Sequence, residues 1–491
     1  MTEFSHSLAN RFGDVFVRDL IAGTNILVSV NTNGSASGDG LSTDPAISSN
    51  GQYVVFTSSA DNLVPGGTNE QNVYIRDWQA GTTALVSVST DGVDPGNGDS
   101  FLPIISANGR YVLFHSKASN LAAGSSGGGI ENLFFRDLQT GTTYALTSAL
   151  GGVGVYSAAS MTPDGQSVAF IGTTTKASGT LFVWNSQSNA LSYTSSPSIP
   201  SSPFPFVSIS PNGQKLAYLA NSPANLYVAD LVANTISTIN PSGSVSSHAG
   251  LQFSSDGRFL TYAGKTNSAS GAPNVFLYDL QTGNNLLVSQ NFNATGAANT
   301  NSDSPVISPN GRFIAYRSFA TNIIPDDFNN VADLFIYDAS NNATILVSVN
   351  GAGNSTADDR SLKPVFSSDS QTLFFQSWAS DLSAPDCNSD SDIFALDLTA
   401  LPVTGPGGGG STNSASVFYA QLIPAGTFSP NPAISWPLAS GKSYQVQFKT
   451  NLTDSVWLNL PGNLTFIGDT GYVSDPSPAP GQRFYRIVLT P

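Results

Sequence analysis

The 491-residue chain has very little sulfur and little positive charge. Its single cysteine, Cys387, cannot form an internal disulfide bond and does not decide the redox compartment. Only 18 lysine and arginine residues are present, and the net charge is -15 with a pI near 4.3. Because phosphate binding needs clustered basic side chains, we expect no nucleic-acid partner and no affinity for anionic membranes.

Long apolar runs are also missing. No stretch of 18 or more apolar residues exists, so we expect no membrane-spanning segment. The opening segment MTEFSHSLANRF lacks the basic and apolar regions of a secretory signal peptide. Met1 falls inside an expected strand, so the true start of the chain, and a leader upstream of it, stay open.

Turn-forming residues dominate what is present. Of the 33 acidic residues, 30 are aspartate, the choice expected where carboxylates cap turns rather than line helices. Glycine occurs 46 times, and 40% of the residues are hydrophobic, which is enough to form packed cores. The composition therefore predicts an all-β, loop-rich protein.

One phrase returns seven times at spacings of 44 to 59 residues, which indicates a repeat architecture. In six copies the centre is Asn-Gly or Asp-Gly, a dipeptide that accepts the positive φ of a tight hairpin turn, and in the seventh it is Asp369-Ser370. The copies read ISSNGQYVVF, ISANGRYVLF, MTPDGQSVAF, ISPNGQKLAY, FSSDGRFLTY, ISPNGRFIAY and FSSDSQTLFF. Each predicts two strands, A and B, joined by a tight turn.

A second phrase follows each copy, as in NVYIRDWQAGTTALVSV. It predicts strands C and D, and four residues after the Asp or Asn that ends strand C the chain carries only Gly or Asn, a left-handed turn position. A repeated four-stranded antiparallel unit of this length is typical of a β-propeller blade. The phrases resemble the TolB-type or WD-type propeller repeat over roughly residues 1–400, a fold that hosts binding scaffolds, lyases and peptidase accessory domains.

The two ends of the repeat region predict how the ring closes. The chain opens with a C and D stretch and finishes its repeats with an A, B and C set that ends at Asp397. We expect strand Ile26 to Val30 to supply the missing D strand of the last blade, which gives a seven-bladed propeller. Because the opening C strand is then surplus, an eight-bladed ring is the alternative.

A Gly- and Pro-rich linker at 401–415 separates this region from a second domain at 416–491. The second domain alternates apolar and polar residues as half-buried strands do, and it resembles a fibronectin type III-like β-sandwich module of secreted bacterial proteins. Its aromatic residues fit either a glycan-stacking platform or, in the interpretation that we favour, a sandwich core. They are Trp436, Trp457, Phe484 and Tyr485.

Catalytic motifs are scarce in the sequence. His6, His115 and His248 lie in unrelated repeat contexts, and we interpret them as solvated or packed side chains. The G-x-S-x-G string at 124–128 lies in a Gly- and Ser-rich loop rather than a strand-to-helix elbow. The Arg-Asp pairs that end several C strands, such as Arg76-Asp77, are expected to close Asx turns rather than to form a charge relay. We therefore predict no catalytic residues.

The connections between strands B and C and between strands D and A are long and variable, so we expect the functional surface on the face that they form. A protein or glycan ligand is expected there, on an acidic rim. The predicted ligand-binding residues are Asp39, Asp44, Asp94, Asp99, Asp303, Asp358 and Asp359.

Two of these loops carry oxygen-bearing side chains at short, alternating spacing, as calcium loops do, although neither has the complete EF-hand pattern. The string DCNSDSD supplies Asp386, Asn388, Asp390 and Asp392, and the preceding blade supplies the aligned Asp327, Asn329 and Asp333. We predict calcium as the only cofactor, against the alternative of solvated turns.

The sequence thus predicts a non-catalytic binding or protein-interaction scaffold, monomeric and placed at the periplasm, cell surface or exterior of a bacterium. The competing class is a polysaccharide-active lyase or hydrolase that uses Asp carboxylates near the propeller channel.

Overall fold

A computed structural model of the chain describes residues 13–490. Excepted are the segments 67–69, 124, 126–130, 148–149, 151–153, 176–177, 196–198, 201–205, 221–224, 240–249, 266–270, 325–326, 328, 330, 351–354, 383–390, 401–420, 424–432, 438–442, 450–456, 462–463, 468–469 and 477–483. The described part is all-β apart from one 3-10 turn at Leu398–Ala400.

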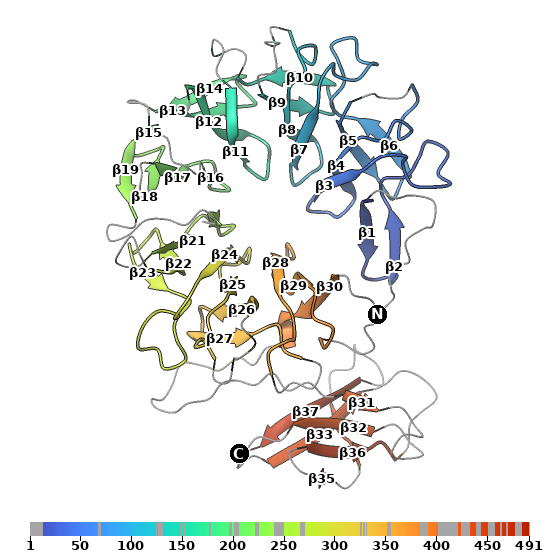
Figure 1. Ribbon diagram of the computed structural model, residues 1–491, viewed down its shortest axis with the longest axis vertical. Coiled ribbons are helices and arrows are strands. Elements are labelled where there is room, and N and C mark those ends of the chain that lie inside the picture. Colours follow the sequence, from blue (N-terminus) through green and yellow to red (C-terminus); the bar gives the residue numbers. More distant parts are fainter. Residues whose placement is uncertain are drawn as a thin grey trace. The chain divides into compact units, whose positions relative to one another are not determined.

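The repeats form the seven blades of a β-propeller, labelled by strand in Figure 1, as the sequence predicted. In each blade the strands pair with their neighbours in chain order, antiparallel. Blade 1 contains β3 (Ser42–Ile47), β4 (Tyr53–Ser58), β5 (Asn72–Asp77) and β6 (Thr82–Leu85); blade 2 contains β7 (Ser100–Ile105), β8 (Tyr111–Ser116), β9 (Asn132–Asp137) and β10 (Thr142–Ala145). Blade 3 contains β11 (Gly154–Met161), β12 (Ser167–Thr175), β13 (Ser178–Asn185) and β14 (Ala190–Thr194), with β15 (Ile199–Pro200) added beside β13.

The remaining blades follow the same plan. Blade 4 contains β16 (Val207–Ile209), β17 (Lys215–Ala220), β18 (Asn225–Asp230) and β19 (Thr235–Thr238); blade 5 contains β20 (Gln252–Phe253), β21 (Phe259–Lys265), β22 (Pro273–Asp279) and β23 (Asn285–Leu287). Blade 6 contains β24 (Ser302–Ile307), β25 (Phe313–Ser318), β26 (Asp333–Asp338) and β27 (Ala343–Leu346); blade 7 contains β28 (Ser361–Phe366), β29 (Thr372–Ser377) and β30 (Asp392–Asp397).

The prediction for the closing strand is wrong. Strand β2 (Thr24–Leu27) pairs with β1 (Phe16–Asp19) in a separate two-stranded sheet, while the sheet of blade 7 contains three strands. The hairpin carries the same internal contacts as a complete blade, because Asp19 Oδ1 accepts hydrogen bonds from the main-chain N–H groups of Ile21 and Ala22. A tight turn between adjacent strands costs far less loop-closure entropy than pairing with a strand some 370 residues away. The local C–D hairpin therefore forms.

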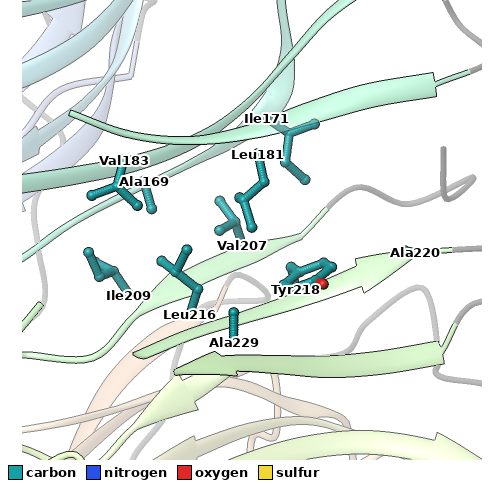
Figure 2. Close-up of a cluster of buried hydrophobic side chains, with 10 residues drawn as sticks. All are labelled: Ala169, Ile171, Leu181, Val183, Val207, Ile209, Leu216, Tyr218, Ala220 and Ala229. Carbon is teal, nitrogen blue, oxygen red and sulfur yellow. The ribbon is translucent and has the colours of Figure 1, made fainter. Parts of the chain in front are cut away.

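The apolar core lies between successive blades. The middle strands B and C are buried nearly throughout, as in the patterns of β8 and β9, whereas strand β19 at a D edge is exposed at every position. Figure 2 shows one such core, in which Ala169, Ile171, Leu181 and Val183 of blade 3 meet Val207, Ile209 and Leu216 of blade 4. Side chains that alternate along a strand thus pack against both neighbouring blades.

The turns between strands A and B hold adjacent blades in register. In blade 1 Ser48 Oγ donates to Asn50 Oδ1 and accepts the N–H of Tyr53, while Gly51 takes a φ of +73°. A hydrogen bond from the N–H of Ser49 to the carbonyl oxygen of Ala107 joins this turn to the corresponding turn of blade 2. The same type of bond joins Ala107 to Pro163 and Ser255 to Pro309.

The C–D turns confirm the Asx-turn interpretation of the Arg-Asp pairs. Asp77, Asp137, Asp230, Asp279, Asp338 and Asp397 each accept main-chain N–H groups two or three residues ahead. In several blades the same carboxylate also binds a basic side chain from the start of strand B, as in Arg312–Asp338 at 2.6 Å. The neighbouring Arg76 and Arg136 instead donate to Thr83 and Thr143 on strand D, so they form no relay with their adjacent Asp.

The C-terminal region contains two sheets. One orders β31 (Gln421–Ile423), β32 (Ala433–Pro437), β36 (Thr470–Ser474) and β35 (Thr465–Ile467), and the other orders β34 (Leu458–Asn459), β33 (Ser443–Lys449) and β37 (Phe484–Thr490). Ile434 and Val473 of the first sheet share a buried cluster with Val446 of the second. The fibronectin type III-like assignment stays a prediction, and the linker 401–415 lies outside the described residues.

Contacts between residues divide the chain into two compact units, one of residues 1–288 with 303–311 and one of residues 289–302 with 312–491. The predicted boundaries at 1–400 and 416–491 stay predictions. Among the described residues, no helix has the length and apolarity needed to cross a bilayer.

Replacing Gly109 by Ala is expected to destabilise the propeller by more than replacing Gly51 by Ala. Both glycines have φ near +73°, which costs an L-residue roughly 1–2 kcal/mol. A Cβ at Gly109 would also lie 2.3 Å from the Tyr53 ring of the adjacent blade, whereas one at Gly51 meets nothing within 4 Å. Urea denaturation of both variants measures the difference, and equal losses would contradict the proposed contact between blades.

Replacing Arg312 by Met should lower the unfolding free energy at pH 7 by roughly 1.5–3 kcal/mol, the range for hydrogen bonds to charged groups. Asp338 is 2% exposed and accepts Nε and Nη2 of Arg312 at 3.0 and 2.6 Å. Burial alone would raise the pKa of Asp338, but the bonds from Arg312 and Ser340 hold it below its usual value. The contribution is therefore present above the unfolded pKa and is lost as the pH falls through the folded pKa.

The matched control is Arg110→Met, because Arg110 makes the same bidentate contact to Asp137 at a more exposed position. Denaturation at pH 7 and pH 3 should show a smaller loss for this control. An Arg312→Met loss that does not shrink at pH 3 would refute the charge-based explanation.

Candidate functional site

The antiparallel order of the strands places the B–C and D–A connections at the same end of each blade. We call the surface formed by these connections the loop face. The tight A–B and C–D turns lie at the other end, and their polar groups are used within the turns. The loop face is therefore where larger structural variation between blades is found.

On the loop face, the D–A and B–C connections of a blade are joined by a reciprocal pair of hydrogen bonds, which we call the loop clamp. In blade 2 the N–H of Asn97 donates to Asn120 Oδ1 at 2.9 Å, and Asn97 Oδ1 accepts the N–H of Ser119 at 2.8 Å. The clamp occurs in blades 1, 2, 6 and 7 and uses the pairs Asp39/Asn62, Asn97/Asn120, Asn299/Asn322 and Asp358/Asp381.

The clamped loops also pack closely. A Cβ at Gly40 would lie 2.6 Å from the main chain at Ser59 and Ala60, and one at Gly96 would lie 2.9 Å from Leu121. The missing side chains allow the D–A loop to rest directly on the B–C loop. These four loop pairs therefore form a fixed surface rather than separate excursions of the chain.

A β-bulge in strand A adds to the shape of the loop face in the same four blades. The residue before a proline has positive φ in each case, which is unusual for a side chain other than glycine. These residues are Asp44 (φ 50°), Leu102 (52°), Ser304 (52°) and Lys363 (52°). Nothing in the sequence pattern indicated these bulges, because no glycine marks them.

The structure distributes the predicted ligand-binding aspartates over both compact units instead of gathering them. Asp39 and Asp358 belong to loop clamps, and Asp99 forms an ion pair with Lys117 at 3.0 Å. Asp303 is only 6% exposed. Asp44 lies in a bulge, Asp94 accepts the N–H of Ser89 at its carbonyl, and Asp359 accepts the N–H of Arg360. Several of these groups therefore have a structural role within their loops.

In blade 6 the structure brings together the three predicted metal ligands Asp327, Asn329 and Asp333. Asn329 Nδ2 donates to Asp333 Oδ2 at 3.1 Å, and Asp333 Oδ1 accepts Ser348 Oγ at 2.6 Å. Asp333 is fully buried and Asp327 is 3% exposed. In blade 7, Asp386, Asn388 and Asp390 lie outside the described residues, while Asp392 begins β30.

Burial dominates the electrostatics of this group. It raises the pKa of Asp333 to about 7, and the nearby negative charges of Asp327 and Asp381 raise it further, against hydrogen bonds from Ser348 and Asn329. Burial likewise raises the pKa of Asp327. In the part of the chain that the structure describes, no three His, Cys, Asp or Glu side chains are grouped to hold a metal ion by themselves.

The one described histidine is packed, as the sequence interpretation held. His115 is 5% exposed, its ring lies 6.0 Å from that of Phe101, and its Nδ1 lies 2.6 Å from Glu131 Oε1. His6 and His248 lie outside the described residues. In the C-terminal region, Lys449 lies 4.7 Å from the ring of Trp457, and Trp436, Phe484 and Tyr485 belong to β32 and β37.

Sequence reasoning missed the clamp partners on the B–C loops, namely Asn62, Asn120, Asn322 and Asp381. A signal for them was present. The phrases ADNL, ASNL, ATNI and ASDL recur directly after strand B in these four blades. Exposed aromatic residues were missed as well: Phe292 is 53% and Phe319 is 40% exposed on the loop face of blade 6.

Replacing Asn120 by Ala should loosen one loop clamp. The variant removes the acceptor of the Asn97 N–H, which should cost about 1 kcal/mol, and should speed hydrogen exchange in the D–A loop around residues 90–99. Asn120→Asp is the control, because it keeps an oxygen acceptor as Asp381 does in blade 7. If exchange in this loop is unchanged in the Ala variant, the clamp does not order it.

Comparisons with known proteins give fold-level likenesses. No protein-family model matches the chain, and no curated protein matches it. Oligogalacturonate lyase from Vibrio parahaemolyticus is 11% identical over 79% of this chain and 96% of its own, with a TM-score of 0.46. Dipeptidyl peptidase 4 from Porphyromonas gingivalis is 13% identical over 84% and 59%, with a TM-score of 0.48. TolB from Acinetobacter baumannii is 17% identical over 53% and 58%, with a TM-score of 0.32.

Proposed function

We propose that the protein is a non-catalytic binding scaffold that works outside the cytoplasm of a bacterium and uses its loop face to hold a protein or glycan ligand. The observation that carries this proposal is the loop clamp, repeated in four blades. A surface whose loops are already ordered loses little conformational entropy on binding, so more of its contact energy appears as affinity.

The side chains on this surface suit a polar ligand with flat or apolar faces. In blade 6, Phe319 is 40% exposed and Arg317 lies 5.3 Å from its ring. In blade 7, Arg360 lies 4.4 Å from the ring of Trp378. Aromatic rings beside charged groups can stack on sugar rings or on protein side chains while the neighbouring polar atoms bind hydroxyl or amide groups.

One observation favours the competing class, a polysaccharide-active enzyme. In the blade 7 clamp both partners are carboxyl groups, and their pKa values are separated. Burial and the charge of Asp358 raise the pKa of Asp381, whereas hydrogen bonds from Ser380 outweigh burial and lower that of Asp358. Pairs of carboxyl groups with separated pKa values are typical of acid–base catalysis. Both groups also hold loops together, so we rank this alternative second.

The binding proposal is tested with the full-length chain on a glycan array and against immobilised extracellular proteins. Phe319→Ala should weaken binding to the ligand identified there by roughly tenfold, as expected for loss of about 1.4 kcal/mol of aromatic contact. Phe466→Ala is the matched control, because Phe466 is 53% exposed but lies on β35 of the C-terminal region. Equal affinity of the Phe319 variant and the unchanged protein would remove the loop face of blade 6 from the proposed surface.

Turnover is tested on the same ligands by measuring new reducing ends and unsaturated products. The scaffold proposal expects none. Product formation that Asp381→Asn abolishes would replace it with the enzymatic alternative.

A further inference from the structure

In blade 6 the B–C loop meets the D–A loop that leads to blade 7. One nitrogen atom, Asn329 Nδ2, donates both to Asp333 Oδ2 at 3.1 Å and to the carbonyl oxygen of Ala357 at 2.9 Å. Two oxygen acceptors from different loops therefore converge on one point. Both acceptor residues are fully buried at 0% exposure.

A third oxygen in this loop lacks a donor. Asp327 is 3% exposed, and its Oδ1 has no hydrogen-bond partner. Its charge acts directly on Asp333, and both charge interactions acting on Asp333 come from acids, Asp327 and Asp381. Burying two carboxyl groups together without a counter-charge is unfavourable, so the arrangement calls for a positive charge.

The corresponding position in other blades shows what is unusual here. Asn72, Asn132 and Asn274 stand where Asp333 stands, and Asn72 and Asn132 likewise accept a hydroxyl hydrogen bond from the end of strand D. The amide nitrogens of Asn72 and Asn274 donate to carbonyl oxygens of the preceding loop. An amide satisfies this buried position without charge, whereas blade 6 replaces it with a carboxyl group and adds Asp327 six residues earlier.

We propose that Asp327, Asp333, the main-chain carbonyl of Ala357 and the side-chain amide of Asn329 bind one calcium ion. The Asn329 amide, turned by half a rotation, would present its oxygen at the point that its nitrogen occupies, since the two ends have nearly the same shape. Ser348 supports Asp333 from the far side through its hydroxyl group.

The donor set favours calcium over other divalent ions. It consists only of oxygen atoms, two from carboxylates and two from neutral carbonyl groups, and calcium accepts such mixed and irregular sets with waters completing six to eight ligands. Magnesium requires a near-octahedral shell and gives up its waters reluctantly. Zinc prefers nitrogen and sulfur donors, and this site offers neither.

The test compares the full-length chain stripped with chelator and the same chain in millimolar calcium chloride. Calcium should raise the melting midpoint by several degrees and bind in a calorimetric titration, with a smaller effect of equimolar magnesium. Asp333→Asn restores the amide of the other blades, so it should fold, bind one calcium ion fewer and lose part or all of the shift. Asp327→Asn should behave in the same way.

The matched control is Asn72→Asp, which places a carboxyl group at the same point of blade 1, where Gly66 stands in place of Asp327. It should be destabilised in chelator and in calcium alike and should keep the calcium stoichiometry of the unchanged protein. No calcium binding by the unchanged protein would overturn the proposal. So would an unaltered stoichiometry in both the Asp333 and the Asp327 variants.

Discussion

The propeller depends on short side-chain oxygens that satisfy buried main-chain N–H groups at the ends of strands. The clearest example is the contact at the start of each C strand. Ser87 Oγ accepts the N–H of Val73 and donates to Asn72 Oδ1, and Thr147 and Ser348 make the same pair of bonds in blades 2 and 6. Buried polar groups of this kind must be paired, because leaving one unpaired costs about 1–3 kcal/mol. This requirement explains why the chain is rich in Ser, Thr, Asn and Asp and nearly free of Glu.

The same requirement separates what the sequence predicts from what it does not. Turns were predictable because Asn50-Gly51 and its equivalents combine an Asx acceptor with a residue that tolerates positive φ. The blade count followed from their repetition. The bulge at Leu102 could not be predicted, because its positive φ is imposed by strand pairing and the next proline rather than by the residue itself. Closure by Ile26 to Val30 was predicted wrongly, since an aligned strand does not reveal which neighbour it pairs with.

The candidate site shows a similar division. The spacing of Asp327, Asn329 and Asp333 indicated oxygen ligands, and the structure brings Asn329 and Asp333 into contact. The sequence could not reveal that Asp333 is fully buried, or that the carbonyl oxygen of Ala357, some 24 residues further on, faces the same amide. Contacts between loops from different strands depend on the register of the whole blade, and local spacing carries no information about it.

The four clamped blades share more than the clamp. Each pairs two buried serine hydroxyls between strands A and B, at Ser42/Ser58, Ser100/Ser116, Ser302/Ser318 and Ser361/Ser377. The serine on strand B also accepts the N–H two residues ahead, where the B–C loop begins, so the buried pair fixes the first residues of the clamped loop. A substitution in the sheet interior can therefore alter the loop face without touching it. In blades 6 and 7 this chain of bonds runs from the serine pair through Ser380 and Asp358 toward Ala357, so the order of the proposed calcium site depends on the packing of the blade beneath it.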